Sequence, residues 1–209
     1  MNLVFDFGAV LFGWQPAQIV AGYFPLQAAT PAAAAQMAQS IFGHDDWHAF
    51  DRGSLSMDLV LARTAQRLAL PTAPLQALIE GIGDGLQPID ATLSVLAALS
   101  QRRQQRGDVR LYYLSNMPAP YARTLERKHA FLQWFDGGIF SGDVLRCKPD
   151  PVIYQMLQMR HALVPAQTVF IDDLQGNVNA ACALGWRGIH FLSAQQLQQS
   201  LANLLGQHS

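Results

Sequence analysis

Acidic side chains stand directly after two short apolar runs of this sequence. Asp6 follows the run at residues 3–5, and Asp172 and Asp173 follow the run at residues 168–171. Carboxylates that lie together repel one another and raise each other's pKa unless a cation compensates. Mg²⁺ prefers oxygen ligands and commonly bridges one or two carboxylates to a substrate phosphate. These residues therefore predict a magnesium site for phosphoryl transfer, with Asp6 as the covalent nucleophile.

Polar groups that suit the same chemistry follow or precede other elements. Ser115 and Asn116 end the apolar run at residues 109–114, and Lys148 precedes a helix that we expect from about residue 151. An ammonium at Lys148 can stabilise the attacking carboxylate and the charge that develops on the phosphoryl oxygens. Ser115, Asn116 and nearby backbone amides can bind those oxygens.

Each of these residues also has an ordinary structural explanation. Asp6 alone is typical of a turn, Asp172 and Asp173 of a helix cap, and Lys148 of a solvated surface. Their order along the chain and their common position at strand ends make the combination far more specific than any one of them.

The elements that position these residues alternate along the chain. Short apolar runs at residues 3–5, 109–114, 168–171 and 188–192 predict buried strands, and helical stretches at 91–106 and 151–162 separate some of them. This alternation predicts an α/β fold, a Rossmann-like parallel sheet with helices on both faces. In such sheets ligands bind beyond the carboxyl ends of the strands, where the polar residues fall.

A long interval separates the first two strands, from about residue 14 to residue 88. It is far longer than an ordinary crossover, and helical spacing recurs at residues 31–42, 56–70 and 74–82. We therefore expect a small all-helical cap inserted after the first strand, at residues 15–85, with residues 1–14 and 86–209 forming the catalytic core. A last amphipathic helix is predicted at residues 194–207.

The bulk composition excludes several classes of protein. Half of the 209 residues are hydrophobic, 14% are charged, and the formal net charge is −1, which favours a packed globular core and gives no electrostatic reason to expect nucleic acid. We find no signal peptide and no apolar run long enough to cross a membrane, so a soluble cytoplasmic protein is expected. A monomer and a homodimer are both compatible with the sequence.

Four segments together resemble the motifs of the haloacid dehalogenase-like (HAD) hydrolase superfamily. In chain order they lie at residues 5–11, 114–116, 148–154 and 170–185. The resemblance implies a phosphatase with Asp6 as nucleophile, Ser115 and Lys148 at the phosphoryl group, and Mg²⁺ bound by Asp6, Asp172 and Asp173. Residues 47–56 resemble the cap segment of the subfamily with a small helical cap. Within that subfamily the sequence resembles α-D-glucose-1-phosphate phosphatase-like members, so the expected substrate is a small phosphorylated metabolite such as a sugar phosphate.

Gly8 departs from the pattern of most phosphatases of this superfamily. They carry a second Asp two positions after the nucleophile, which acts as general acid and base. Gly8 can still offer its backbone carbonyl to the metal, but it cannot transfer a proton. The loss of such help costs roughly 10²–10⁴-fold in rate, so hydrolysis that favours activated leaving groups is expected.

Two other functions compete with a phosphatase. A metal-independent 2-haloacid dehalogenase also uses an Asp nucleophile without the second Asp, but it has no use for the paired acids Asp172 and Asp173. A catalytically weak HAD-fold binding protein is favoured by Gly8 and opposed by Asp6 and Lys148. The candidates for residues that determine substrate specificity are Trp14, His44, Asp45, Trp47 and His48. The alternative explanation for them is ordinary packing of the aromatic rings in the cap, with the polar groups on an exposed helix.

Overall fold

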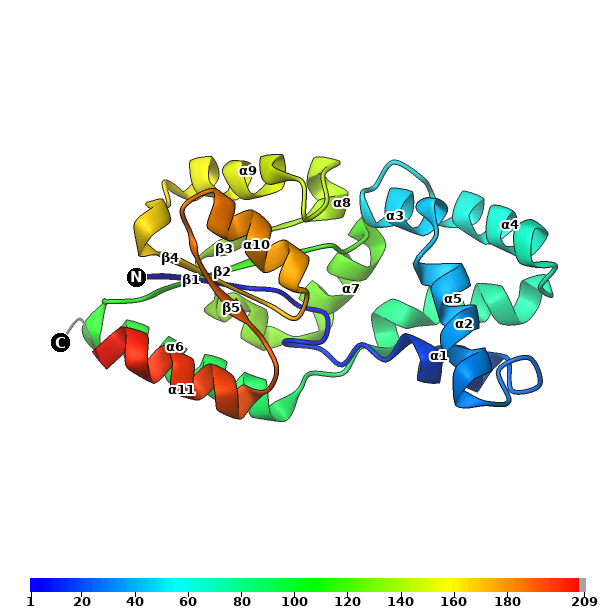
Figure 1. The fold of residues 1–209 in the computed structure, drawn as a ribbon, viewed down its shortest axis with the longest axis horizontal. Coiled ribbons are helices and arrows are strands. Elements are labelled where there is room, and N and C mark those ends of the chain that lie inside the picture. Colours follow the sequence, from blue (N-terminus) through cyan, green and yellow to red (C-terminus); the bar gives the residue numbers. More distant parts are fainter. Residues whose placement is uncertain (207–209) are drawn as a thin grey trace.

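Five parallel strands form the centre of the structure, a computed structural model that describes residues 1–206 (Figure 1). The strands pair in the order β3-β2-β1-β4-β5, so β1 lies in the middle. They are β1 (Asn2–Phe5), β2 (Arg110–Ser115), β3 (Gly137–Phe140), β4 (Thr168–Asp172) and β5 (Arg187–His190).

Alternate side chains of the strands face two separate cores. On β1, Leu3 and Phe5 belong to one buried cluster, and Val4 belongs to the other. Figure 1 shows α6 (Asp90–Arg106) and α11 (Ala194–Gly206) over one face of the sheet, and α9 (Pro151–His161) and α10 (Gln175–Ala183) over the other. Because neighbouring residues of a strand point to opposite faces, a strand that is covered on both sides must be apolar throughout. The predicted α/β sheet with helices on both faces is confirmed.

The long interval after β1 forms a separate helical lobe, seen on the right of Figure 1. Its helices are α1 (Pro16–Tyr23), α2 (Pro31–Phe42), α3 (Asp45–Asp51), α4 (Met57–Leu68) and α5 (Thr72–Gly85). Local signals start two of them: the Thr30 side chain accepts a hydrogen bond from the Ala33 amide at α2, and Ser56 accepts one from Leu59 at α4. The exact boundaries between this cap and the core, at residues 14/15 and 85/86, stay a prediction.

Side-chain hydrogen bonds fasten the cap to the core beside the carboxyl ends of the strands. The Tyr121 hydroxyl, on α7 (Ala119–Lys128), donates to the Ile79 carbonyl on α5 at 2.6 Å. The Ser141 hydroxyl, at the start of α8 (Ser141–Val144), donates to the carbonyl of Asp51 at the end of α3. These contacts set the cap over the strand ends where the polar residues lie.

The edge strand β3 was not predicted from the sequence. Its first residues, Gly137 and Gly138, have the composition of a turn, yet they pair with Tyr112 and Tyr113 of β2. A Cβ on Gly138 would lie 2.3 Å from the Tyr113 ring, so this strand needs glycine to pack beside that side chain. Two short 3₁₀ helices, at Ala130–Trp134 and Pro165–Gln167, complete the described elements. The last predicted helix is present to Gly206, and its predicted end at residue 207 lies outside the described residues.

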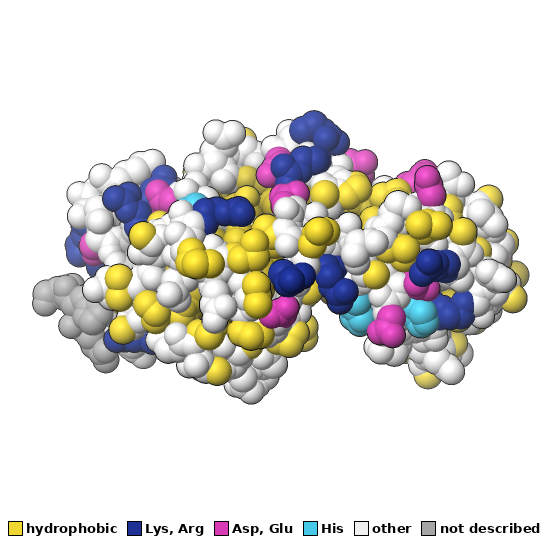
Figure 2. Space-filling view, turned by 90° about the horizontal axis from the view of Figure 1, so that it is seen from above, with side chains coloured by type: hydrophobic (Ala, Val, Ile, Leu, Met, Phe, Trp, Pro, Cys, Tyr) yellow, Lys and Arg dark blue, Asp and Glu magenta, His cyan; other side chains and the backbone are white. Residues whose placement is uncertain are grey.

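Charged side chains of both signs are scattered over the face of the molecule in Figure 2, where the cap and the core are seen as two lobes. This mixture agrees with the net charge of −1. None of the described helices has the length and apolar character needed to span a membrane.

Candidate active site

The parallel sheet brings the polar residues of three neighbouring strands to one edge. β1 pairs with β2 on one side and with β4 on the other. Asp6 directly after β1, Ser115 at the end of β2 and Asp172 at the end of β4 therefore lie beside one another, at the carboxyl ends where α/β sheets bind ligands. All three residues are buried, with exposed fractions of 7%, 1% and 0%.

Lys148 joins two of these carboxylates. Its Nζ lies 2.7 Å from Asp6 Oδ1 and 2.7 Å from Asp172 Oδ2. Burial favours the neutral amine, but the two carboxylates outweigh it and raise the pKa of Lys148. The lysine is therefore a fixed positive charge in contact with the predicted nucleophile.

The carboxylate of Asp172 is fully engaged by the protein itself. Besides Lys148, it accepts hydrogen bonds from Asn177 Nδ2 at 3.0 and 3.1 Å and from the Leu174 amide at 2.8 Å. Asp173, in contrast, is half-buried and lines the cavity described below. Of the two predicted acids, Asp172 is placed to hold the lysine, and Asp173 is the one open to a ligand.

The Asn116 side chain braces the segment that carries Lys148. Its Nδ2 donates to the Lys148 carbonyl at 3.0 Å, and its Oδ1 accepts from the Lys148 amide at 2.8 Å. The side chain predicted to bind substrate is thereby occupied, and its backbone remains as the part that could meet a phosphoryl oxygen. Ser115 is buried and lines the cavity, so its hydroxyl is a second group that could meet a phosphoryl oxygen.

A cavity of about 310 Å³ lies between the strand ends and the cap. Its polar end holds the predicted residues Asp6, Gly8, Ser115, Asn116, Lys148 and Asp173. Of the predicted cap candidates, Trp14, Trp47 and His48 line it. His44 instead accepts a hydrogen bond from the Asp46 amide at the start of α3, and Asp45 is exposed on the first turn of that helix.

Asn177 and Asp51 are among the lining residues that were not assigned a role from the sequence. Asn177, on α10, fixes the Asp172 carboxylate, and Asp51, at the end of α3, brings an acid from the cap to the cavity. Asn177 lies five positions after Asp172, one turn into a helix, which is a spacing that could have indicated a contact. No local signal distinguishes Asp51 from a surface acid.

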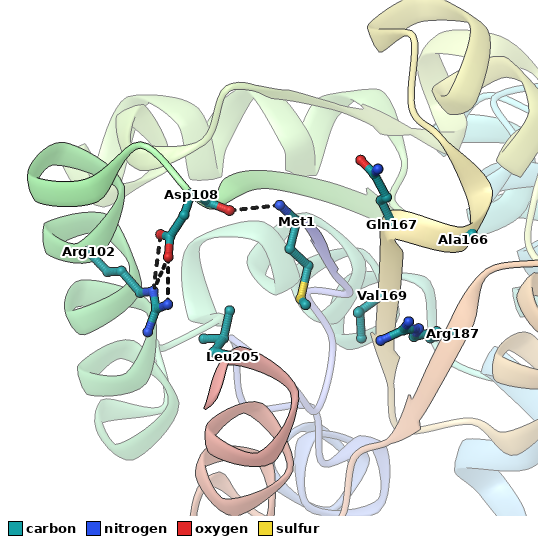
Figure 3. Close-up of a pocket in the computed structure, with 8 residues that line it drawn as sticks. All are labelled: Met1, Arg102, Asp108, Ala166, Gln167, Val169, Arg187 and Leu205. Carbon is teal, nitrogen blue, oxygen red and sulfur yellow. Dashed lines mark hydrogen bonds and ion pairs between the residues drawn. The ribbon is translucent and has the colours of Figure 1, made fainter. Parts of the chain in front are cut away.

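A second cavity, of about 320 Å³, lies at the opposite, amino-terminal end of the sheet (Figure 3). Two of its charged groups are held by Asp108: Arg102 pairs with the Asp108 carboxylate, and the Met1 amino group donates to the Asp108 carbonyl at 2.7 Å. Because none of the predicted catalytic residues lines it, we place the candidate site at the carboxyl ends.

Comparisons with known proteins bear on the fold of this chain. No protein-family model matches the chain. It is similar to the sesquiterpene phosphatase astK of Aspergillus oryzae, with 29% identity over 204 residues, or 97% of this chain and 95% of that protein. A HAD family enzyme of Bacteroides thetaiotaomicron, solved in complex with magnesium and inorganic phosphate, has a TM-score of 0.68 at 18% identity, over 90% of this chain and 92% of that one. The chain has the haloacid dehalogenase-like fold.

The same fold also occurs in an enzyme of different chemistry. L-2-haloacid dehalogenase of Xanthobacter autotrophicus has a TM-score of 0.66 and 18% identity, over 97% of this chain and 82% of that one. The fold is thus shared with an enzyme solved with magnesium and inorganic phosphate and with a dehalogenase. The finer likeness to α-D-glucose-1-phosphate phosphatases stays a prediction, because the relatives named here are a sesquiterpene phosphatase, a HAD family enzyme and a dehalogenase.

The donor set of the site fits a divalent cation. Oxygens of Asp6, Asp172 and Asp173 all lie within 4.8 Å of one another. Burial, together with the charges of Asp172 and Asp173, raises the pKa of Asp6 to about 7 although Lys148 opposes the shift. Burial and Asp172 likewise raise the pKa of Asp173. One lysine does not compensate for three carboxylates, and oxygen ligands of this kind suit Mg²⁺. Asp6, Asp172, Asp173 and the Gly8 carbonyl are the groups that could hold it, and of the two adjacent acids Asp173 is the one that lines the cavity.

Without metal, we expect the stability of the protein to fall as the pH rises from about 4 to about 7. The pKa of Asp6 has an ordinary value of 3.8 and is about 7 in the fold, so between these values the folded state keeps a proton that the unfolded state has lost. The contribution of Asp6 to stability therefore decreases with rising pH, by roughly 4 kcal/mol at most. Melting temperatures in EDTA across this range would measure it. Asp6→Asn should make the decrease less steep, with the raised pKa values of Asp51 and Asp173 accounting for the rest, and an unchanged slope in that variant would contradict the assignment to Asp6.

Proposed function

We propose that this chain is a magnesium-dependent phosphatase that hydrolyses a small phosphomonoester through an aspartyl-phosphate intermediate. The observation that carries the proposal is the cluster at the strand ends, in which Lys148 Nζ lies 2.7 Å from Asp6 Oδ1 beside the open acid Asp173. The similarity to a sesquiterpene phosphatase supports it, as does the shared fold with an enzyme that binds magnesium and inorganic phosphate.

Asp6, Lys148 and Ser115 have different roles in the proposed reaction. An oxygen of the Asp6 carboxylate attacks phosphorus, and the bond from phosphorus to the leaving oxygen breaks. The phosphoryl group passes to Asp6, and water then releases it as inorganic phosphate. Lys148 stabilises the attacking carboxylate and the equatorial charge, while the Ser115 hydroxyl binds a phosphoryl oxygen. A bound Mg²⁺ would neutralise the charge that accumulates between the carboxylates and the phosphate.

In this mechanism no side chain at position 8 protonates the leaving group. Gly8 stands where a proton donor would be expected, so the departing oxygen leaves as an anion or takes its proton from water. Substrates whose alcohols are acidic are hydrolysed fastest under this mechanism. A sugar 1-phosphate, with its anomeric leaving oxygen, is the substrate that the sequence favours.

A metal-independent dehalogenase is the second candidate, and the shared fold with L-2-haloacid dehalogenase favours it. The carboxylate cluster opposes it, because a metal-free nucleophilic displacement gains nothing from Asp173 facing the nucleophile. A weak binding protein with this fold is the third candidate, and it would leave the contact between Lys148 and Asp6 without a use.

Assays that begin with the hydrolysis of p-nitrophenyl phosphate distinguish the phosphatase, the dehalogenase and the binding protein. We expect turnover in Mg²⁺, its loss in EDTA and its recovery when Mg²⁺ is added back. Metal-independent release of chloride from 2-chloropropionate would instead establish the dehalogenase. Inactivity toward a broad panel of both substrate types, by protein that is folded and loaded with Mg²⁺, would leave the binding protein.

A further inference from the structure

On the basis of the phosphatase function proposed above, we infer that the substrate is the phosphate monoester of an apolar alcohol. Its hydrocarbon part would bind the cap side of the cavity. We call this side the apolar wall; it consists of Trp14, Phe42, Trp47, Ile82 and Leu86.

The cavity has two chemically different ends. The carboxylates, the lysine and the serine lie at the strand ends, whereas the apolar wall faces them from the cap side. Three rings of the wall pack edge to face in a row, with centroids 5.2 Å apart for Trp14 and Phe42 and 4.7 Å apart for Phe42 and Trp47. Trp14 and Phe42 are only half-buried, so they keep surface that a ligand can cover. Apolar pockets with a few fixed polar groups are typical of small-molecule sites.

Polar groups for sugar hydroxyls are scarce on the cap side. Tyr121 lines the cavity, but its hydroxyl already donates to the Ile79 carbonyl at 2.6 Å. His48 and Asp51 are the polar residues that the cap itself contributes. Burial raises the pKa of Asp51 well above its usual value, which disfavours the charged carboxylate beside the wall. A sugar would bury several hydroxyls here without partners, which is unfavourable.

The cavity volume limits the size of the alcohol that can bind. About 310 Å³ is at the lower end of the usual range for ligand sites, roughly 300–1,000 Å³. The cavity must also hold the phosphoryl group, so the wall covers only part of a long chain.

Para-alkylphenyl phosphates test the inference, because the acidity of the phenol hardly changes along the series. We expect kcat/KM to rise by about fourfold for each methylene that the wall covers, until the chain leaves the cavity. Binding of hexylphosphonate, followed by the fluorescence of Trp14 and Trp47, should be at least tenfold tighter than that of methylphosphonate. Glucose 1-phosphate, which shares an activated leaving group but is polar, should have a lower kcat/KM than propylphenyl phosphate.

Phe42→Gln should remove much of this dependence on chain length. The matched control is Ile19→Gln, which places the same polar side chain at a half-buried apolar position of the cap that does not line this cavity. The ratio of kcat/KM between long and short chains is measured within one protein, so it does not depend on how much of a variant folds. The ratio should fall in Phe42→Gln and stay unchanged in Ile19→Gln.

The apolar substrate and the phosphatase function would be overturned by different experimental outcomes. Turnover of p-nitrophenyl phosphate in Mg²⁺ with no gain along the alkyl series, or with glucose 1-phosphate preferred, would overturn the apolar substrate and leave the phosphatase. Equal chain-length ratios in the wild type and Phe42→Gln would overturn the role of the wall. The absence of any phosphatase activity would overturn the proposed function itself.

Discussion

Asp6→Asn is expected to lower the turnover of p-nitrophenyl phosphate by at least about 10⁴-fold, because it removes the nucleophile on which every later step depends. The change keeps the size and shape of the side chain. It also keeps an oxygen that can accept the hydrogen bond from the Phe7 amide, which now reaches Asp6 Oδ1 at 2.7 Å. Lys148 retains Asp172 as a partner. The variant should therefore fold, and steady-state kinetics in Mg²⁺ would measure the loss.

Asp58→Asn is the matched control. Asp58 is exposed on α4, and the same isosteric change there should leave kcat within about twofold. Melting curves of both variants would establish that they are folded under the assay conditions. Residual activity of Asp6→Asn within tenfold of the wild type would show that another group attacks phosphorus.

Gly8→Asp is expected to speed the hydrolysis of phosphates with poor leaving groups, such as hexyl phosphate, by roughly 10²–10⁴-fold. The substitution introduces a carboxyl that can protonate the departing oxygen. The structure has room for it: a Cβ on Gly8 would have Trp14 Cβ, at 3.9 Å, as its nearest neighbour, and the Gly8 backbone is not left-handed. The rate for p-nitrophenyl phosphate should hardly change, because its leaving group needs no proton. The slope of log kcat/KM against leaving-group pKa measures both effects.

Gly8→Asn separates proton transfer from the effect of a larger side chain. It has nearly the shape of the aspartate variant and no acidic proton, so it should keep the steep dependence on the leaving group that we expect of the wild type. Equal rates in Gly8→Asp and Gly8→Asn would contradict the explanation. So would a wild type whose rates are the same for good and poor leaving groups, since a second proton donor would then already be present.

The sequence by itself determined the class of fold and most of the residues at the strand ends. Buried strands such as β1 and β4 have an unbroken apolar run, residues 3–5 and 169–171, and polar residues such as Asp6, Ser115 and Asp172 stand at the strand ends, so both signals are local in the chain. The carboxyl ends of parallel strands lie at the same edge of the sheet, so these residues come together there independently of the loop conformations. The edge strand β3 could not be predicted in this way. Its glycines pair with residues of β2 that are distant in the sequence, and the Tyr113 ring leaves no room for a larger side chain at Gly138.

Only the tertiary structure decided how the gathered residues divide their tasks. Asp172 and Asp173 are adjacent and identical in type, yet one is enclosed by Lys148, Asn177 and the Leu174 amide while the other faces the cavity. The Asn116 side chain is taken by the backbone of Lys148. The apolar wall likewise combines residues of α2, α3, α5 and the segments beside β1 and α5. These outcomes depend on side-chain directions and on contacts between distant segments, which neither composition nor spacing specifies.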